Sequence, residues 1–276
     1  LVVPTDVSDP NQVEAAAEAV ERAFGPIDVW VNNAMVSVFA PVKQMSADEY
    51  RRVTEVTYLG VVYGTLAALR RMLPRDHGSI VQVGSALAYR GLPLQSAYSA
   101  AKHAVRGFSE SLRAELLHDG SKVHVTMVHL PAVNTPQFAW VKARLTRKPR
   151  PVPPVYDPAV AAEAIVWAAH HRRREMLVGA PLVQGILATK LAPGLAERFL
   201  AEQGYEMQQA DEPLEPNRKD NLWSPVQGDH GAHGPFAGET RQKSTQLWLN
   251  TRRNWILGGM LSALSLFFLF SSRSRG

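Results

Sequence analysis

Short apolar runs alternate with longer segments of helical periodicity over residues 1–180. In the longer segments apolar side chains recur every three or four positions, as Val13, Ala17 and Val20 do. The predicted helices are residues 10–24, 46–73, 95–117 and 157–170. The apolar runs predict strands at residues 1–3, 27–31, 79–83, 123–129 and 176–178. Strands that alternate with helices in this way predict an α/β fold with a doubly wound parallel sheet.

The character of the chain changes after residue 180. We divide the chain into an incomplete α/β domain, a helical extension, a polar tail of weak structure and an apolar C-terminal helix. Their boundaries are residues 1–180, 181–204, 205–246 and 247–276. The tail is rich in Gly, Pro, Asp and Gln and shows little periodicity, which favours weak structure. Residues 137–156 are rich in proline and basic residues and predict a loop or lid.

Composition narrows the class of protein. Of the 276 residues 46% are hydrophobic, which is enough for a core, and none is cysteine. Disulfides and thiolate chemistry are therefore excluded, and we assign no metal site. The net charge is +5, but the basic residues do not form a run interleaved with aromatic residues. We therefore expect no nucleic-acid partner.

Residues 255–270 are uncharged and mostly apolar, with arginines on both sides. These sixteen residues fall short of the roughly 20 that span a bilayer, although tilting or snorkelling can rescue a short span. Trp255 at one edge suits a membrane interface. Two interpretations stay open: a membrane anchor, or a helix that packs on the domain or in a dimer. We expect a cytoplasmic homo-oligomer, with membrane association through this segment left open.

Ser85, Tyr98 and Lys102 carry the candidate chemistry. Tyr98 and Lys102 are four residues apart in a predicted helix and therefore share one face, and Ser85 follows a predicted strand. A lysine ammonium beside a phenol favours the phenolate and lowers the pKa of the tyrosine. Such a tyrosine can exchange a proton with a carbonyl or alcohol oxygen, which a serine hydroxyl can hold. The pattern predicts hydride-transfer chemistry.

Other polar residues also follow predicted strands. Asp6, Asn32 and Thr135 each lie just past an apolar run. Ligands of a doubly wound sheet bind at the carboxyl ends of its strands. We therefore expect these residues and Ser85 to line one crevice.

Over residues 1–180 the chain resembles the short-chain dehydrogenase/reductase family. The segments that carry the resemblance are Asp6-Val7, Asn32-Asn33-Ala34-Met35, Ser85, Tyr98, Lys102 and Pro131-Ala132-Val133-Asn134-Thr135. The resemblance implies a Rossmann-like fold, NAD or NADP as cofactor, and a small carbonyl or alcohol substrate. The apolar C-terminal segment weakly favours an apolar substrate.

The resemblance also implies residue roles. Tyr98 is expected to be the general acid or base, Lys102 to hold the nicotinamide ribose, and Ser85 to orient the substrate oxygen. The residues expected to bind the cofactor are Asp6, Val7, Asn32, Ala34, Tyr98, Lys102, Pro131, Val133 and Thr135. Among them, Asn32 and Ala34 are expected on the adenosine side, and Thr135 at the carboxamide.

Three substitutions depart from the family pattern. Thr57 stands where the family usually carries an asparagine that holds a water in a proton relay, and its hydroxyl has a shorter reach. Met35 and Ala132 replace glycines, which is costly where the backbone needs a positive φ.

The family's opening unit of strand, glycine-rich turn, helix and strand has no counterpart in this chain. The first strand is central in such sheets, so we expect about 40–55 further residues upstream. Two functions remain: an NAD(P)-dependent oxidoreductase, or a truncated or degenerate relative that binds a partner or a membrane without turnover. The presence of Ser85, Tyr98 and Lys102 together favours the enzyme.

Overall fold

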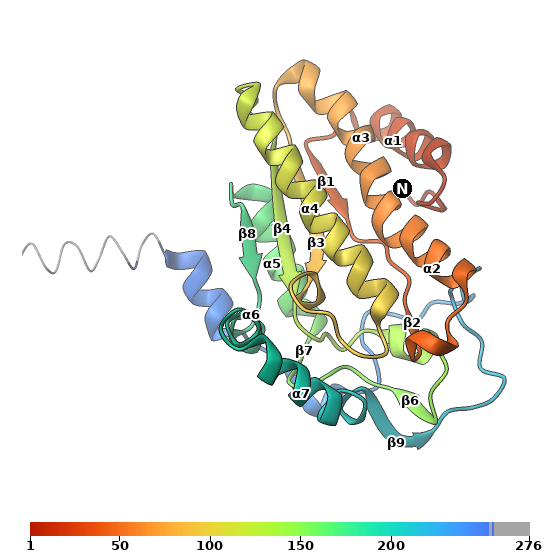
Figure 1. The fold of residues 1–276 in the computed structure, drawn as a ribbon. Helices are drawn as coiled ribbons and strands as arrows, with labels where there is room; N and C mark the ends of the chain where they lie inside the picture. Colours follow the sequence, from red (N-terminus) through yellow and green to blue (C-terminus); the bar gives the residue numbers. More distant parts are fainter. Residues whose placement is uncertain (254–255, 257–276) are drawn as a thin grey trace, which may run out of the picture.

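A computed structural model describes residues 1–253 and Ile256 (Figure 1). Four parallel strands form the central sheet in the order β1-β3-β4-β8. They are β1 (Val29–Asn32), β3 (Ser79–Ser85), β4 (His124–Leu130) and β8 (Glu175–Leu177). The structure confirms an α/β fold with a parallel central sheet of the Rossmann-like type.

Helices cover both faces of this sheet (Figure 1). The four main helices are α1 (Pro10–Phe24), α3 (Gly60–Met72), α4 (Ser96–His118) and α5 (Pro158–His170). Apolar side chains of α1, α3 and α4 pack around Ile80 of β3, whereas those of α5 pack around Val81 of the same strand. Successive strand residues point to opposite faces, so a parallel sheet covered on both sides is apolar along its whole length.

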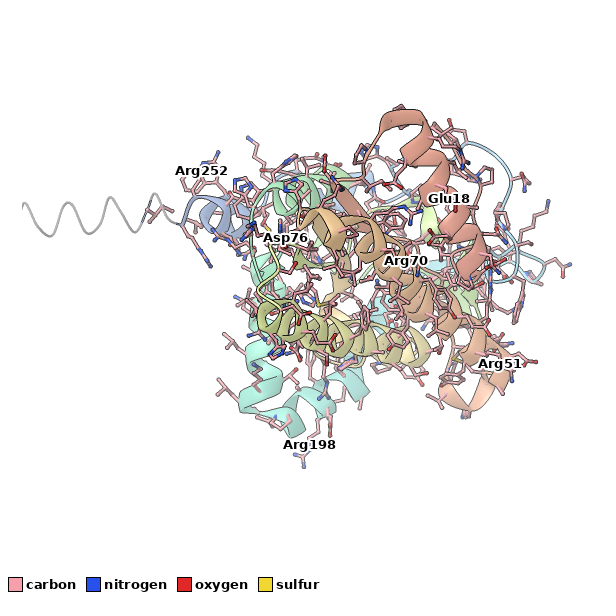
Figure 2. The ribbon with its side chains drawn as sticks, turned by 90° about the horizontal axis from the view of Figure 1, so that it is seen from above. Glu18, Arg51, Arg70, Asp76, Arg198 and Arg252 are labelled. Carbon is pink, nitrogen blue, oxygen red and sulfur yellow. The ribbon has the colours of Figure 1, made fainter. Side chains whose placement is uncertain are left out.

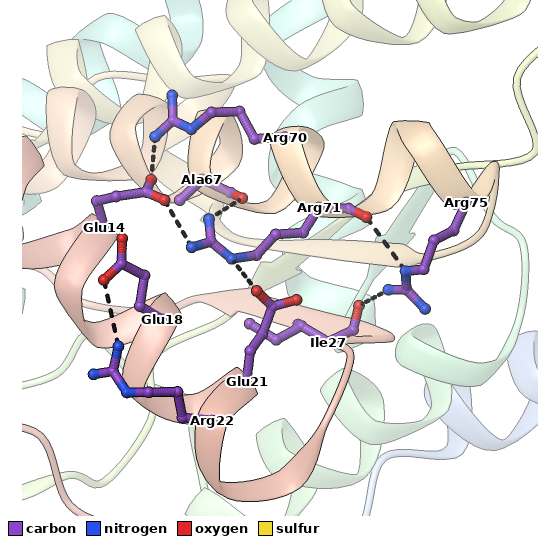
Figure 3. A network of polar contacts seen from close by, with 9 residues as sticks. All are labelled: Glu14, Glu18, Glu21, Arg22, Ile27, Ala67, Arg70, Arg71 and Arg75. Atoms are coloured by element: carbon purple, nitrogen blue, oxygen red, sulfur yellow. Dashed lines mark hydrogen bonds and ion pairs between the residues drawn. The ribbon is translucent and has the colours of Figure 1, made fainter.

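Ion pairs join α1 to α3, which cover the same face of the sheet (Figure 3). The Arg71 guanidinium lies 2.7 Å from Glu14 and 2.9 Å from Glu21, and donates to the carbonyl of Ala67. Arg71 is mostly buried, so these three partners satisfy a cation that would be costly to bury alone.

The predicted helix 46–73 is present but interrupted. It consists of α2 (Ala47–Thr54), a π turn over Glu55–Leu59 and α3, and it begins with a capping box between Ser46 and Glu49. Single π turns inside helices are often found at functional sites. This turn contains Thr57.

Residues 1–3 do not form the predicted strand. Among the described residues no strand pairs with residues 1–3, so they lack the inter-strand hydrogen bonds that a strand requires. Residues 181–204, for which the sequence predicts a helix, are covered by two helices, α6 (Ala180–Leu191) and α7 (Pro193–Gln203), which are separated at Ala192.

The segment 137–156 is more ordered than a loop. It contains β5 (Lys142–Ala143), β6 (Arg147–Pro149) and β7 (Val155–Tyr156), and β5 pairs with β2 (Val38–Phe39). The remaining short helical turns are Val42–Gln44, Leu73–Arg75, Ala86–Ala88, Pro136–Ala139, Glu206–Gln208 and Ala237–Glu239.

Residues 205–246 differ most from the sequence prediction of weak structure. They contain β9 (Gln209–Pro213), which pairs with β6, and β10 (Thr240–Arg241), which pairs with β7. Gln208 and Leu222 within this segment are fully buried. The segment is held by individual contacts with the domain and not by one apolar face. Its sequence therefore shows no helical or strand periodicity. The division of the chain into four parts stays a prediction.

Charged side chains such as those of Arg51, Arg198 and Arg252 lie at the periphery (Figure 2). Within residues 1–253 no helix is both long enough and apolar enough to cross a membrane. The membrane interpretation concerns residues 255–270, which apart from Ile256 lie outside the described residues. It therefore stays a prediction.

Candidate active site

The carboxyl ends of neighbouring strands bring the predicted residues to one edge of the sheet. Asn32 ends β1 and pairs in register with Gln82, while Ser85 ends β3 and pairs with Leu130 of β4. Pro131 follows directly. The structure thus places Asn32, Ser85 and the segment 131–135 at the same edge, as expected for a ligand crevice.

Tyr98 and Lys102 reach this edge from the first two turns of α4. Lys102 is 2% exposed, and its Nζ lies 5.6 Å from the centre of the Tyr98 ring. The helix starts just after Leu94, a buried residue with φ of +68°. A non-glycine residue in this left-handed conformation is strained, and such strain tends to occur where a fixed geometry serves function.

Burial sets the proton affinities of this pair. Desolvation raises the pKa of Tyr98 to about 12, against the opposite effect of a hydrogen bond with the Ser85 side chain. Desolvation lowers the pKa of Lys102 to about 8, and its ammonium donates to the carbonyl of Val83 at 2.6 Å. The pKa of Tyr98 is therefore raised overall, because the cost of burying a phenolate outweighs the lowering by Ser85. The lowering of this pKa by Lys102 stays a prediction.

Thr57 is fully buried, and its hydroxyl is hydrogen-bonded to the loop that follows β1. Its hydroxyl donates to the carbonyl of Val36 at 2.8 Å and accepts from the amide of Val36 at 3.1 Å. Both bonds fasten the segment after Asn32-Asn33-Ala34 to the π turn. The single hydroxyl proton is committed to this contact, so the geometry favours a positioning role over a proton relay through this side chain.

The residues predicted for the adenosine side have structural partners. Asp6 accepts from Arg52 at 2.9 Å, and the Asn32 amide donates to Gln82 and Thr65 inside the fold. Hydrogen bonding to Ser8 and Arg52 lowers the pKa of Asp6, although burial opposes this. Neither side chain points freely into a ligand site.

A cavity of about 100 Å³ lies beside these residues. Val7, Asn32 and Ala34 line it. Ligand sites are usually larger, about 300–1,000 Å³. This end of the site is therefore too small, as it stands, for the adenosine half of a dinucleotide.

The nicotinamide end offers a better fit. Lys102 supplies a cation and Tyr98 a hydroxyl, both suited to a ribose. The Thr135 hydroxyl makes no capping bond to the turn Pro136–Ala139 that it precedes. Among residues 1–253 only Asp76 and Leu94 are non-glycine residues with positive φ, so Met35 and Ala132 fit their backbones.

A buried polar cluster behind Ser85 was not predicted. His129 Nδ1 lies 3.2 Å from the Ser85 carbonyl, and Nε2 lies 3.9 Å from Glu175. Tyr89 donates to Glu175 at 2.7 Å. The nearby His129 imidazole and the hydrogen bond from Tyr89 lower the pKa of Glu175 to about 2, although burial opposes this. A histidine within the apolar run 123–129 was the signal available in the sequence.

A parallel sheet with a serine, a tyrosine and a lysine at its carboxyl edge is the arrangement expected of a nicotinamide-dependent oxidoreductase. Comparison with known families agrees, because the family model described as short chain dehydrogenase matches residues 1–145. The chain belongs to the short-chain dehydrogenase family, whose members generally bind NAD or NADP.

Individual relatives give the same result. The chain is 33% identical over 244 residues to the uncharacterized oxidoreductase YxnA of Bacillus subtilis, covering 88% of this chain and 68% of that protein. It is 35% identical over 140 residues to a 3-dehydrosphinganine reductase of Danio rerio, covering 50% and 42%. A crystal structure of a short-chain dehydrogenase from Streptomyces avermitilis is 29% identical, with a TM-score of 0.58 over 73% of this chain and 78% of that one.

Proposed function

We propose that this protein transfers a hydride between NAD or NADP and a carbonyl or alcohol substrate, with Tyr98 as the general acid or base. The observation that carries the proposal is the meeting of Ser85, Tyr98 and Lys102 at the carboxyl edge of the sheet. The alternative of a non-catalytic relative is less favoured, because all three side chains lie together.

In the reductive direction Tyr98 gives its proton to the substrate oxygen. A pKa of about 12 keeps the phenol protonated at neutral pH, which is the form that donates. The Ser85 hydroxyl, hydrogen-bonded with Tyr98, holds the same oxygen in reach of the proton. The cofactor, when bound, supplies or accepts the hydride.

We assign the nicotinamide end of the cofactor to Lys102 and Thr135, with Pro131 and Val133 shaping the backbone between them. The ammonium is the one cation within reach of the Tyr98 ring in the described contacts. We assign the adenosine half of the cofactor to Asp6, Val7, Asn32 and Ala34. Of these, Asp6 and Asn32 already have hydrogen-bond partners within the protein.

An apolar substrate is the second part of the proposal. Phe39 and Phe138 pack edge to face at 6.2 Å, and Phe236 packs on Phe138 at 5.9 Å. This cluster adjoins the segment that contains Thr135, so it offers an apolar wall next to the proposed reaction centre. One relative is named as a 3-dehydrosphinganine reductase.

The test is oxidation of NADH and NADPH by the full-length protein with a panel of short and long-chain ketones. Tyr98→Phe keeps the ring but removes the proton, so kcat should fall about 10²–10⁴-fold with nucleotide binding retained. Tyr63→Phe on α3, whose ring packs against the apolar cluster around Ile80, is the matched control and should stay within about twofold of the wild type. Nucleotide binding without any Tyr98-dependent turnover would favour the non-catalytic alternative.

A further inference from the structure

The polar segment 205–246, here called the extension, is packed along the segment 131–157 that follows β4. Strand β9 pairs with β6, and β10 pairs with β7. In Figure 1 the extension leaves β9, passes beside β2 and α2, and returns toward β7. The amide of Asn221 donates to the carbonyl of Trp140 at 3.1 Å, and Leu222 is fully buried. The extension therefore covers the part of the chain that contains Thr135.

Charge complementarity aligns these two segments. Four of the five basic residues between 142 and 150 pair with acidic residues of the extension, whereas Arg144 pairs with Glu49 of α2. The pairs are Lys142–Asp220 at 3.4 Å, Lys148–Glu212 at 2.7 Å, Arg147–Glu206 and Arg150–Glu239. Exposed pairs contribute little stability one by one, so their main effect is to fix the register of one segment on the other.

A buried contact between the two segments falls on Asn134, the residue before Thr135. Asn134 is fully buried and makes three hydrogen bonds with the extension. The amide of Gly234 donates to its carbonyl at 3.0 Å, its own Nδ2 donates to the Gly234 carbonyl at 3.2 Å, and its Oδ1 accepts from the amide of Phe236 at 3.1 Å. A buried amide with its donor and acceptor both satisfied holds its neighbours firmly.

Gly234 touches the backbone of Thr135 directly. A Cβ added at Gly234 would lie 2.4 Å from the Thr135 carbonyl oxygen and 2.7 Å from Asn134 Oδ1. Real Cβ atoms do not approach backbone atoms so closely, so only glycine fits here. The extension and the Thr135 segment are thus in backbone contact.

We propose that Asn134 is a positioning residue, which with Gly234 fastens the extension onto the segment 131–135 and so fixes the orientation of Thr135 toward the nicotinamide end of the cofactor. The inference rests on the proposed function, since it assumes that Thr135 faces a nucleotide. It also assigns the extension a role in cofactor binding, although it lies some 100 residues away in sequence.

Gly234→Ala, compared with Gly238→Ala, tests this in the full-length protein. Both add one methyl group to the same extension, but no atom lies within 4 Å of a Cβ at Gly238. Fluorescence titration with NADH and NADPH should show a dissociation constant at least about tenfold higher for Gly234→Ala, and within twofold of wild type for Gly238→Ala. In turnover, KM for the nucleotide should rise more than kcat falls, because the displaced group binds cofactor and transfers no proton.

Asn134→Asp is the second variant, for the case in which Gly234→Ala does not fold. It keeps the acceptor for Phe236 but places a buried carboxylate oxygen against the Gly234 carbonyl in place of the donor, so the dissociation constant should rise at least as much as in Asn134→Ala. Folded Asn134 variants that bind nucleotide within twofold of wild type would overturn the inference. They would leave the proposed function intact, because Tyr98→Phe tests turnover and these variants test binding. A wild-type protein that bound neither nucleotide would overturn both.

Discussion

Lys102 and Tyr98 show how burial changes the chemistry of individual residues. Each lies in a setting that opposes its charged form, so the pKa of the tyrosine rises and that of the lysine falls. The result at neutral pH is a protonated phenol beside a mostly protonated amine. The pair is thus suited to proton donation, and its amine is held by the Val83 carbonyl.

Lys102→Met should reveal the cost of burying this ammonium. The folded-state pKa of about 8 lies below the unfolded value of 10.5, so the unfolded chain binds the proton more tightly between these values. Wild-type stability from this group therefore rises as pH increases from about 8 toward 10.5, by on the order of 1–3 kcal/mol. Methionine cannot titrate, so the variant should lack this rise. Urea unfolding at pH 7.5, 8.5 and 9.5 measures it, and equal slopes for the two proteins would contradict it.

At the scale of secondary-structure elements, the Glu175 carboxylate connects β8 to β4 and to the turn after β3. Glu175 starts β8, lies 3.9 Å from His129 on β4 and accepts from Tyr89 after β3. Arg106 of α4 stacks on the Tyr89 ring at 4.1 Å. Because His129 also contacts the Ser85 carbonyl, this cluster supports the strand end that presents Ser85.

Glu175→Gln should remove an acid-sensitive part of the stability. The pKa of Glu175 is depressed to about 2, so its contribution is present above the ordinary value of 4.5 and is lost as pH falls from there toward 2. The wild type should be more stable than the variant at pH 6, and the difference should shrink at pH 4 and again at pH 3. Thermal unfolding at these three pH values tests this. A difference that did not depend on pH would mean that packing, not charge, explains the effect.

At the scale of the whole molecule, the extension closes one side of the domain through several weak contacts and a few buried ones. Leu222 joins the apolar cluster that contains Val36 and Ala97, and Leu247, just after the extension, packs with α5. The surface ion pairs, three of which involve residues before Leu222, orient the extension on the segment 142–150.

The Lys148–Glu212 pair allows the electrostatic part to be tested alone. Lys148→Glu should speed chymotryptic cleavage of the extension, where Trp223 is exposed, and adding Glu212→Lys should slow it again. Exposed pairs are worth roughly 0.2–1 kcal/mol, so the change should not exceed about fivefold. Added salt should have a similar effect on the wild type, because it screens the same charges. If the double variant is cleaved as fast as the single one, the pair does not hold the extension.

The sequence by itself determined the alternation of strands and helices, the capping of α2 and the spacing of Tyr98 and Lys102. These depend on residues close in sequence, where helical periodicity and capping rules act directly. It also placed Ser85 at a strand end, which parallel topology then brought to the common edge.

Only the tertiary structure decided the pKa directions, the partner of Thr57 and the packing of the extension. The pKa of Tyr98 depends on how much water its neighbours exclude, and no local pattern reports that. The bonds between Asn134 and Gly234 join residues 100 positions apart through one side-chain amide and through backbone groups that every residue carries. Such contacts leave no periodic signal in the sequence, because their specificity arises from shape, burial and the absence of a side chain at a single glycine.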